Sequence, residues 1–164
     1  MAGLGFATTH SRFSGPSLLA IWREKAAGGI ALRREDLSPK LLKAHLPNIA
    51  IYERMIAEGG ERRYRVRLMG AQFAQVMGNL TNKFIDEAVP AQFLARWYAA
   101  LDAVLEAGLP LRFLSRSETN NKSYLIGEYL EAPLIAPDGS LSIIFAAGIY
   151  APANSWAAPG ENCP

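Results

Sequence analysis

Arg62-Arg63-Tyr64-Arg65-Val66-Arg67-Leu68-Met69-Gly70 is the stretch of sequence that decides the fold. Its apolar members Tyr64, Val66 and Leu68 alternate with arginines, and this period of two predicts a strand with one buried face. A glycine ends the alternation, and residues 71–77 then predict a short helix. A half-buried strand that turns at a glycine into a short helix with Phe and Met on one face is typical of a small sensory fold.

Two helix-start signals precede this strand. Gly15-Pro16 opens an amphipathic helix, because proline is tolerated in the first helical turn. Leu18, Ile21 and Trp22 form its apolar stripe, which predicts a dimer interface because Trp is enriched at interface hot spots. Packing of the same helix on its own sheet is the alternative. Ser38-Pro39 starts a second, short helix, with Ser38 as the N-cap.

The remaining elements follow a simple order. A strand over 48–55 should pair with the arginine strand in a hairpin, and the segment 79–86 is a loop with at most one helical turn. Pro90 to Gly108 is the longest helix, and Gly108 is a plausible residue to end it. The last strands cover 111–118, 123–134 and 141–151, and their hairpin turns imply antiparallel pairing. We therefore expect an α+β fold, with a five-stranded antiparallel sheet, helices packed on one face and an additional N-terminal helix.

Length and composition set limits on the function. At 164 residues the chain is expected to form a single domain over 14–151, with flexible segments at 1–13 and 152–164. The net charge of +2 is nearly balanced, which argues against a dedicated nucleic-acid binder. Cys163 is the single cysteine and fits a reducing compartment. The N-terminus has no signal-peptide pattern, and no apolar run has the length of a membrane span, so we expect a cytoplasmic protein without membrane contact.

The order of the elements resembles that of a PAS domain, and the residues resemble the single-domain PAS-like proteins common in alphaproteobacteria. The patterns that carry the resemblance are Ile21-Trp22 in a helix, Leu46-Pro47 after a short helix, the aromatic-arginine strand 64–70, and the Glu-x-Leu-x-x-Pro-Leu pattern at 128–134. They span about 18–150. The resemblance implies signalling: PAS domains bind small molecules or cofactors between sheet and helices, or they dimerise, and many lack a ligand.

Apolar residues expected between the helical layer and the sheet are candidates for a ligand pocket, because small-molecule sites are concave and mostly apolar. Ordinary core filling by the same residues is the alternative. Met77 is the best candidate, because its flexible thioether adapts to irregular space. The full set comprises Phe73, Met77, Phe84, Trp97, Tyr98, Phe113 and Phe145.

No cofactor or metal is expected. The resemblance implies that a haem-binding relative would carry a histidine on the helix before the third strand, and the helix 90–108 has none. Flavin photosensors of this fold use a cysteine near the short helices, whereas Cys163 lies in the tail. His45 has no Cys or carboxylate nearby at ligand spacing.

Arg63, Arg65 and Arg67 form a row on one sheet face and are candidates for binding a phosphorylated ligand or an acidic partner. The alternative is that they are solvated or paired with carboxylates of neighbouring elements. Glu128 is expected to be a buried partner of one of these arginines, since Glu and Arg are rarely buried unpaired.

No catalytic residues are predicted. The chain lacks a nucleophile next to a base with a third orienting group, a phosphate loop and a dinucleotide fingerprint. We expect a stand-alone cytoplasmic PAS-like sensory and signalling module, not an enzyme, that acts through a protein partner, with or without small-molecule control, and forms a homodimer. The rival interpretations are a small enzyme with an enclosed pocket on a cone-shaped α+β fold, and a purely structural dimer module.

Overall fold

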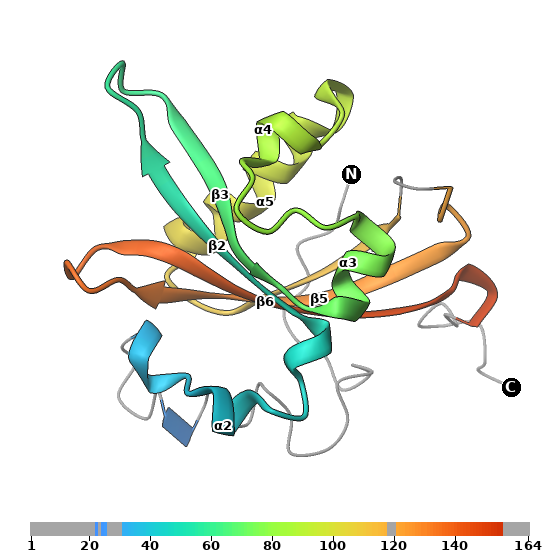
Figure 1. The fold of residues 1–164 in the computed structure, drawn as a ribbon, viewed down its shortest axis with the longest axis horizontal. Helices are drawn as coiled ribbons and strands as arrows, with labels where there is room; N and C mark the ends of the chain where they lie inside the picture. Colours follow the sequence, from blue (N-terminus) through green and yellow to red (C-terminus); the bar gives the residue numbers. More distant parts are fainter. Residues whose placement is uncertain (1–21, 23, 26–30, 118–120, 156–164) are drawn as a thin grey trace, which may run out of the picture.

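The structure, a computed structural model, describes residues 22, 24–25, 31–117 and 121–155 of the 164-residue chain. A twisted sheet forms the centre, with α3, α4 and α5 on one face and α2 on the other (Figure 1). This arrangement confirms the predicted α+β class. We call the first side the helical face and the other the N-terminal face.

The sheet has the strand order β1-β5-β6-β2-β3, and β4 pairs with β5 beside β1. All pairs are antiparallel except β1 with β5, which is parallel. The sequence predicted five strands; β1 is a sixth that was missed, because two residues carry no periodicity and only their contact with β5 defines them. The strands are β1 Leu32–Arg33, β2 Ile49–Ile56, β3 Arg62–Met69, β4 Leu111–Arg116, β5 Leu125–Ile135 and β6 Leu141–Pro152.

The helices begin and end close to the predicted signals. The Ser38 hydroxyl accepts a 3.2 Å hydrogen bond from the Leu41 amide, and Gly108 ends α5 with φ = 63°. The predicted loop at 79–86 contains the start of a one-turn helix. The helices are α2 Pro39–Leu42, α3 Ala71–Met77, α4 Ile85–Ala88 and α5 Ala91–Ala107, and the 3-10 helices are η1 Arg34–Asp36, η2 Leu46–Asn48 and η3 Ala153–Ser155.

The chain ends are described only in part. Trp22, Glu24 and Lys25 are helical, in the region of the predicted N-terminal helix. The expected flexible segment 1–13 lies outside the described residues, and so does the tail from 156 onward. Regular structure continues past the predicted boundary at 151, through the end of β6 and η3.

Each face of the sheet has its own hydrophobic cluster. On the helical face, α5 buries Leu101, Val104 and Leu105 against the sheet. On the N-terminal face, the segment before β2 supplies the buried side chains Trp22, Leu32, Leu37 and Leu42. The protein is therefore a three-layer structure in which the sheet is covered on both sides.

Strand β3 departs from its predicted alternation. Tyr64 and Val66 lie in the helical-face cluster, but Leu68 packs in the cluster of the N-terminal face. The ladder with β2 shifts register at this point, so that β3 has one extra residue, Arg67. The prediction that Leu68 shares a face with Tyr64 and Val66 is wrong, because a β-bulge reverses the direction of the side chains that follow it.

Gly70 ends β3 as predicted. Its amide donates a 2.7 Å hydrogen bond to the Ile49 carbonyl, which brings the start of α3 against η2. A Cβ atom at this position would overlap the backbone of Leu46 and Pro47. Only glycine fits this close approach between two backbones.

Candidate functional site

The site on the helical face is built on two Gly-x-Tyr sequences, Gly127-Glu128-Tyr129 in β5 and Gly148-Ile149-Tyr150 in β6. The antiparallel register pairs Gly127 with Tyr150 and Tyr129 with Gly148. An aromatic ring opposite a glycine has room to lie across it, because no side chain projects there. The two strands therefore place both tyrosines close together on a floor of glycines.

Phe73 of α3 completes an aromatic cluster with these tyrosines. Its ring centroid lies 6.0 Å from that of Tyr129 and 5.8 Å from that of Tyr150, and the two tyrosine rings are 5.7 Å apart. These are the separations of favourable edge-to-face aromatic pairs. A Cβ atom at Gly148 would lie 3.0 Å from the Phe73 ring. The cluster thus fixes where α3 rests on the sheet.

Glu131 lies next to this cluster, two residues after Tyr129 and therefore on the same face of β5. Its Oε2 atom is buried and has no hydrogen-bond partner within the described ranges. The residue opposite it in β6 is the small Ala146. Burial raises the pKa of Glu131 to about 7. The carboxyl group is therefore a buried acceptor whose protonation changes near neutral pH.

The charge of Glu131 acts on three nearby tyrosine hydroxyl groups. Burial raises the pKa of Tyr52 well above its usual value, and the charge of Glu131 raises it further. Burial also raises the pKa of Tyr129 to about 12, and burial with the neighbouring Tyr129 raises the pKa of Tyr150. The phenols are therefore neutral at physiological pH, and Glu131 is the group of this set that titrates near neutrality.

The long helix contributes a further aromatic ring to this group. Trp97 of α5 meets Tyr52 edge-on, with ring centroids 6.5 Å apart and an interplanar angle of 88°. Neutral phenols, aromatic walls and one unsatisfied carboxyl oxygen suit a small molecule that carries an N–H or O–H donor or an amine. Among the described residues, no three His, Cys, Asp or Glu side chains are grouped so that they could hold a metal ion.

The structure brings five of the seven predicted pocket residues to the helical face. Phe73 and Trp97 contact the tyrosines directly, and Phe113 stands opposite Tyr129 in the β4–β5 ladder. Met77 packs in the same cluster, and Tyr98 packs 5.4 Å from Tyr64, centroid to centroid.

Two predicted pocket residues lie elsewhere. Phe145 packs in the cluster of the N-terminal face, because its neighbour Ile144 faces the helices and strand residues alternate. The ring of Phe84 lies at the outer edge of β3, where the Arg63 guanidinium stacks on it at 3.8 Å. Neither residue belongs to the group around Glu131.

The residues missed from the sequence are Tyr52, Tyr129, Glu131 and Tyr150. A signal for them was present. The repeated Gly-x-Tyr pattern in consecutive predicted strands indicates crosswise Gly–Tyr pairs, and a glutamate inside an otherwise apolar strand indicates a buried carboxyl group.

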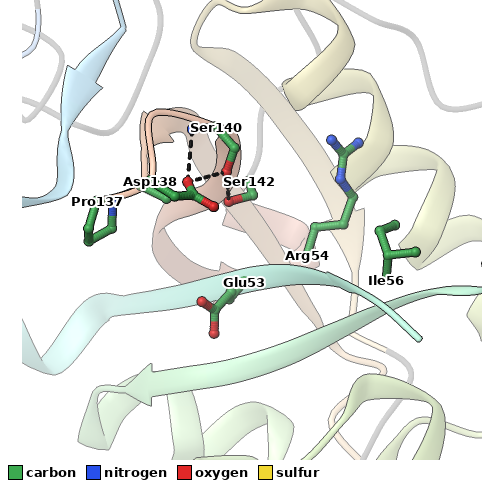
Figure 2. Close-up of a pocket in the computed structure, with 8 residues that line it drawn as sticks. Glu53, Arg54, Ile56, Pro137, Asp138, Ser140 and Ser142 are labelled. Atoms are coloured by element: carbon green, nitrogen blue, oxygen red, sulfur yellow. Dashed lines mark hydrogen bonds between the residues drawn. The ribbon is translucent and has the colours of Figure 1, made fainter. Parts of the chain in front are cut away.

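A pocket lies away from this group, at the end of the sheet where the β2–β3 and β5–β6 hairpins separate (Figure 2). The β2–β6 ladder ends at Glu53 and Ile143, and a pocket of about 460 Å³ opens beyond it. Its polar groups bind one another: the Ser140 hydroxyl lies 2.7 Å from Asp138 Oδ1 and 2.8 Å from the Ser142 hydroxyl. The lining residues are Glu53, Arg54, Ile56, Ala136, Pro137, Asp138, Ser140 and Ser142.

Glu128 is buried, as predicted, but its partner is different. Its Oε1 atom lies 2.6 Å from Arg112 Nε, across the β4–β5 ladder. The expected pairing with an arginine of β3 is wrong, because β6 and β2 lie between β5 and β3 in the sheet.

Trp22, a predicted dimer residue, is 7% exposed and packs in the cluster of the N-terminal face of its own chain. Leu18 and Ile21 lie outside the described residues. The packing of Trp22 agrees with the alternative, in which the helix covers its own sheet, and dimerisation stays a prediction.

Comparison with known proteins gives a family match over residues 10–150, to the family described as PAS domain. No curated protein matches the chain. A solved structure from a flavin-analogue study of the light-oxygen-voltage domain mechanism is 11% identical, with a TM-score of 0.47 over 71% of this chain and 85% of that one. An RNA-binding light-oxygen-voltage receptor is 13% identical, with a TM-score of 0.44 over 68% of this chain and 32% of that one.

Proposed function

Because this chain belongs to the PAS domain family, we propose that it is a sensory module that binds a small molecule beside Glu131 and signals through a partner protein. Its resemblance to single-domain PAS-like proteins of alphaproteobacteria supports a stand-alone module in the cytoplasm. No helix in the described ranges combines the length and apolar character needed to cross a membrane. The module has no catalytic activity of its own in this proposal.

The buried Oε2 atom of Glu131 is the observation that carries the proposal. A buried acceptor without a hydrogen bond costs about 1–3 kcal/mol, and native proteins leave few such groups without a reason. A ligand that donates a hydrogen bond to this oxygen would recover that free energy. Glu131 is thus suited to an amine or to another small molecule with an N–H or O–H group, and the rings of Tyr129, Tyr150 and Trp97 offer apolar walls.

In this proposal the contacts of α3 with the tyrosines transmit the effect of ligand binding to the partner. Phe73 rests on Tyr129 and Tyr150, and α3 follows β3 directly after Gly70. A ligand that prefers one position of the tyrosines would change where α3 rests on the sheet. It would thereby shift the equilibrium between the states that bind the partner and those that do not. The free energy of this shift cannot exceed the difference in the ligand's binding free energy between the two kinds of state.

The test combines native mass spectrometry of the freshly purified protein with thermal unfolding in a library of small amines and other metabolites. A true ligand at about one hundred times its Kd should add about 2.7 kcal/mol to the free energy of unfolding. Glu131→Gln should abolish the shift, because it removes the charged acceptor while keeping the side-chain shape. Glu106→Gln, on the exposed side of α5, is the matched control and should keep it.

Two outcomes contradict ligand sensing. If no compound shifts the unfolding, or if the shift is unchanged in Glu131→Gln, the carboxyl group is not a ligand site. A stable dimer without any ligand effect would favour the purely structural dimer module. Turnover of a bound compound would favour the enzyme.

A further inference from the structure

The arginine row of β3 lies on the N-terminal face. Tyr64 and Val66 point to the helices, so Arg63 and Arg65 point to the other side of the strand. The bulge adds Arg67 to that side, where its Nη1 atom reaches Glu53 Oε2 at 3.2 Å. The bulge therefore extends the row of arginines beyond the point where regular alternation ends.

Arg63 binds two carboxylates of its own chain. Its Nε and Nη2 atoms donate to the two carboxylate oxygens of Asp86 at 2.7 and 2.8 Å, and Nη2 also donates to Glu87 Oε1 at 3.0 Å. The pKa of Asp86 is lowered by the hydrogen bond from Arg63. This two-pronged pair holds α4 against the edge of β3 and shows how a carboxylate fits a guanidinium on this strand.

Arg65 is different. It is half-buried, its Nε atom is buried without a hydrogen-bond partner, and no ion pair joins it to another described residue. Glu53 stands opposite Arg65 in the β2–β3 ladder, but its carboxylate is bound to Arg67. Among the described residues, Glu53 is therefore the carboxylate nearest to both Arg65 and Arg67 in the ladder, and the half-buried Arg65 guanidinium makes no ion pair with any of them.

We propose that Arg65 and Arg67 bind a carboxylate group on an acidic segment of a partner protein. This inference rests on the partner binding proposed above and gives it a surface. The incoming carboxylate would accept hydrogen bonds from Arg65 and compete with Glu53 for Arg67. Solvent reaches this group, since the side chains of Arg67 and Glu53 are 51% and 30% exposed and Arg65 is only half-buried.

A protein carboxylate fits this surface better than a small free anion. The guanidinium groups project from a strand rather than from the floor of an enclosure, and the pocket shown in Figure 2 shares only Glu53 with the group. A single exposed ion pair contributes little affinity, so an extended segment that supplies several contacts is needed for stable binding.

The experiment follows the Nε–H signals of the arginine side chains by NMR in the ligand-free protein. The probe is an eight-residue peptide of alternating Glu and Ser. We expect a saturable shift of the Arg65 signal and about tenfold weaker binding in Arg65→Lys, which keeps the charge but loses the two-pronged geometry. Arg116→Gln on β4, whose side chain donates to the Ser123 carbonyl, is the control and should bind the peptide normally.

Three results would overturn the proposal. The first is an equal shift of the Arg65 and Arg116 signals in the unmodified protein, which indicates unspecific attraction. The second is that inorganic phosphate saturates the shift of the Arg65 signal at the same concentration as the peptide does. The third is unchanged affinity in Arg65→Lys. Glu131→Gln should leave peptide binding intact, so a failure here is distinguishable from a failure of small-molecule sensing.

Discussion

Tyr64 of β3 donates a 2.6 Å hydrogen bond to Asp102 Oδ1 of α5. The other oxygen of this carboxylate lies 2.8 Å from Nη2 of Arg62, two residues before Tyr64 on the same strand. Two residues on the same face of β3 therefore hold one carboxylate of the long helix. Because β3 lies at the edge of the sheet, this link and the Arg63–Asp86 pair fix the strand to the helices that follow it.

Tyr64→Phe should lower the free energy of unfolding by about 1.5–3 kcal/mol, because it removes a hydrogen bond to a charged group and leaves the ring in place. Chemical denaturation measures the change. Tyr98→Phe is the matched control: its ring packs on Tyr64, but among the described residues its hydroxyl makes no hydrogen bond to a charged side chain. Equal losses in the two variants would contradict a specific role for the Tyr64–Asp102 bond.

Gly148→Ala should lower the free energy of unfolding by about 1–3 kcal/mol, as overpacking of a core typically does. The new Cβ atom would lie 3.0 Å from Phe73 and 3.3 Å from Tyr129 and from the Tyr150 hydroxyl. Gly59→Ala is the control, since a Cβ atom there meets nothing within 4 Å. Equal denaturation midpoints for Gly148→Ala and Gly59→Ala would contradict this prediction. They would show that the aromatic rings move aside to accommodate the new methyl group at little cost in free energy.

Much of the fold was predictable because local signals mark it. Ser38 and Pro39 start α2, Gly70 ends β3, and Gly108 ends α5, each for a reason contained in a few neighbouring residues. Strand β1 was not predictable in this way. Its two residues depend on β5, which lies about a hundred positions later in the sequence.

The candidate site was predicted only in part, because its composition depends on the register between strands. Alternation shows that Ile144 and Phe145 face opposite sides, but not which of them meets the helices. The bulge at Arg67 has no mark in the sequence. The crosswise pairing of Tyr129 and Tyr150 with glycines follows from the register of β5 and β6, which the turn between them sets.

The stability of the protein should depend on pH through Glu131. Its pKa is raised from 4.5 to about 7 in the folded state, so the folded protein binds more protons than the unfolded chain between these values. The free energy of unfolding should therefore fall as the pH rises from about 5 to 7, by up to about 3 kcal/mol, since one pKa unit corresponds to about 1.4 kcal/mol.

The comparison of unmodified protein with Glu131→Gln isolates this effect, because the amide does not titrate. Denaturation series at several pH values should show that the variant gains stability relative to the unmodified protein above pH 5. Parallel pH profiles for the two proteins would mean that the carboxyl group is hydrated or paired, and would remove the support for a ligand at this position.

Replacement of Trp22 by Glu separates two roles of the N-terminal helix. Trp22 is buried with Leu32, Leu37 and Leu42 on its own sheet, so Trp22→Glu should lower the free energy of unfolding by at least about 3 kcal/mol, the typical cost of removing a large core side chain. Lys25→Glu, an exposed helical position nearby, is the control and should change stability by less than about 0.5 kcal/mol. Denaturation and size-exclusion chromatography are measured together. A Trp22→Glu protein that is as stable as the control but has changed from dimer to monomer would contradict the burial seen here and would assign Trp22 to an interface between two copies of the chain.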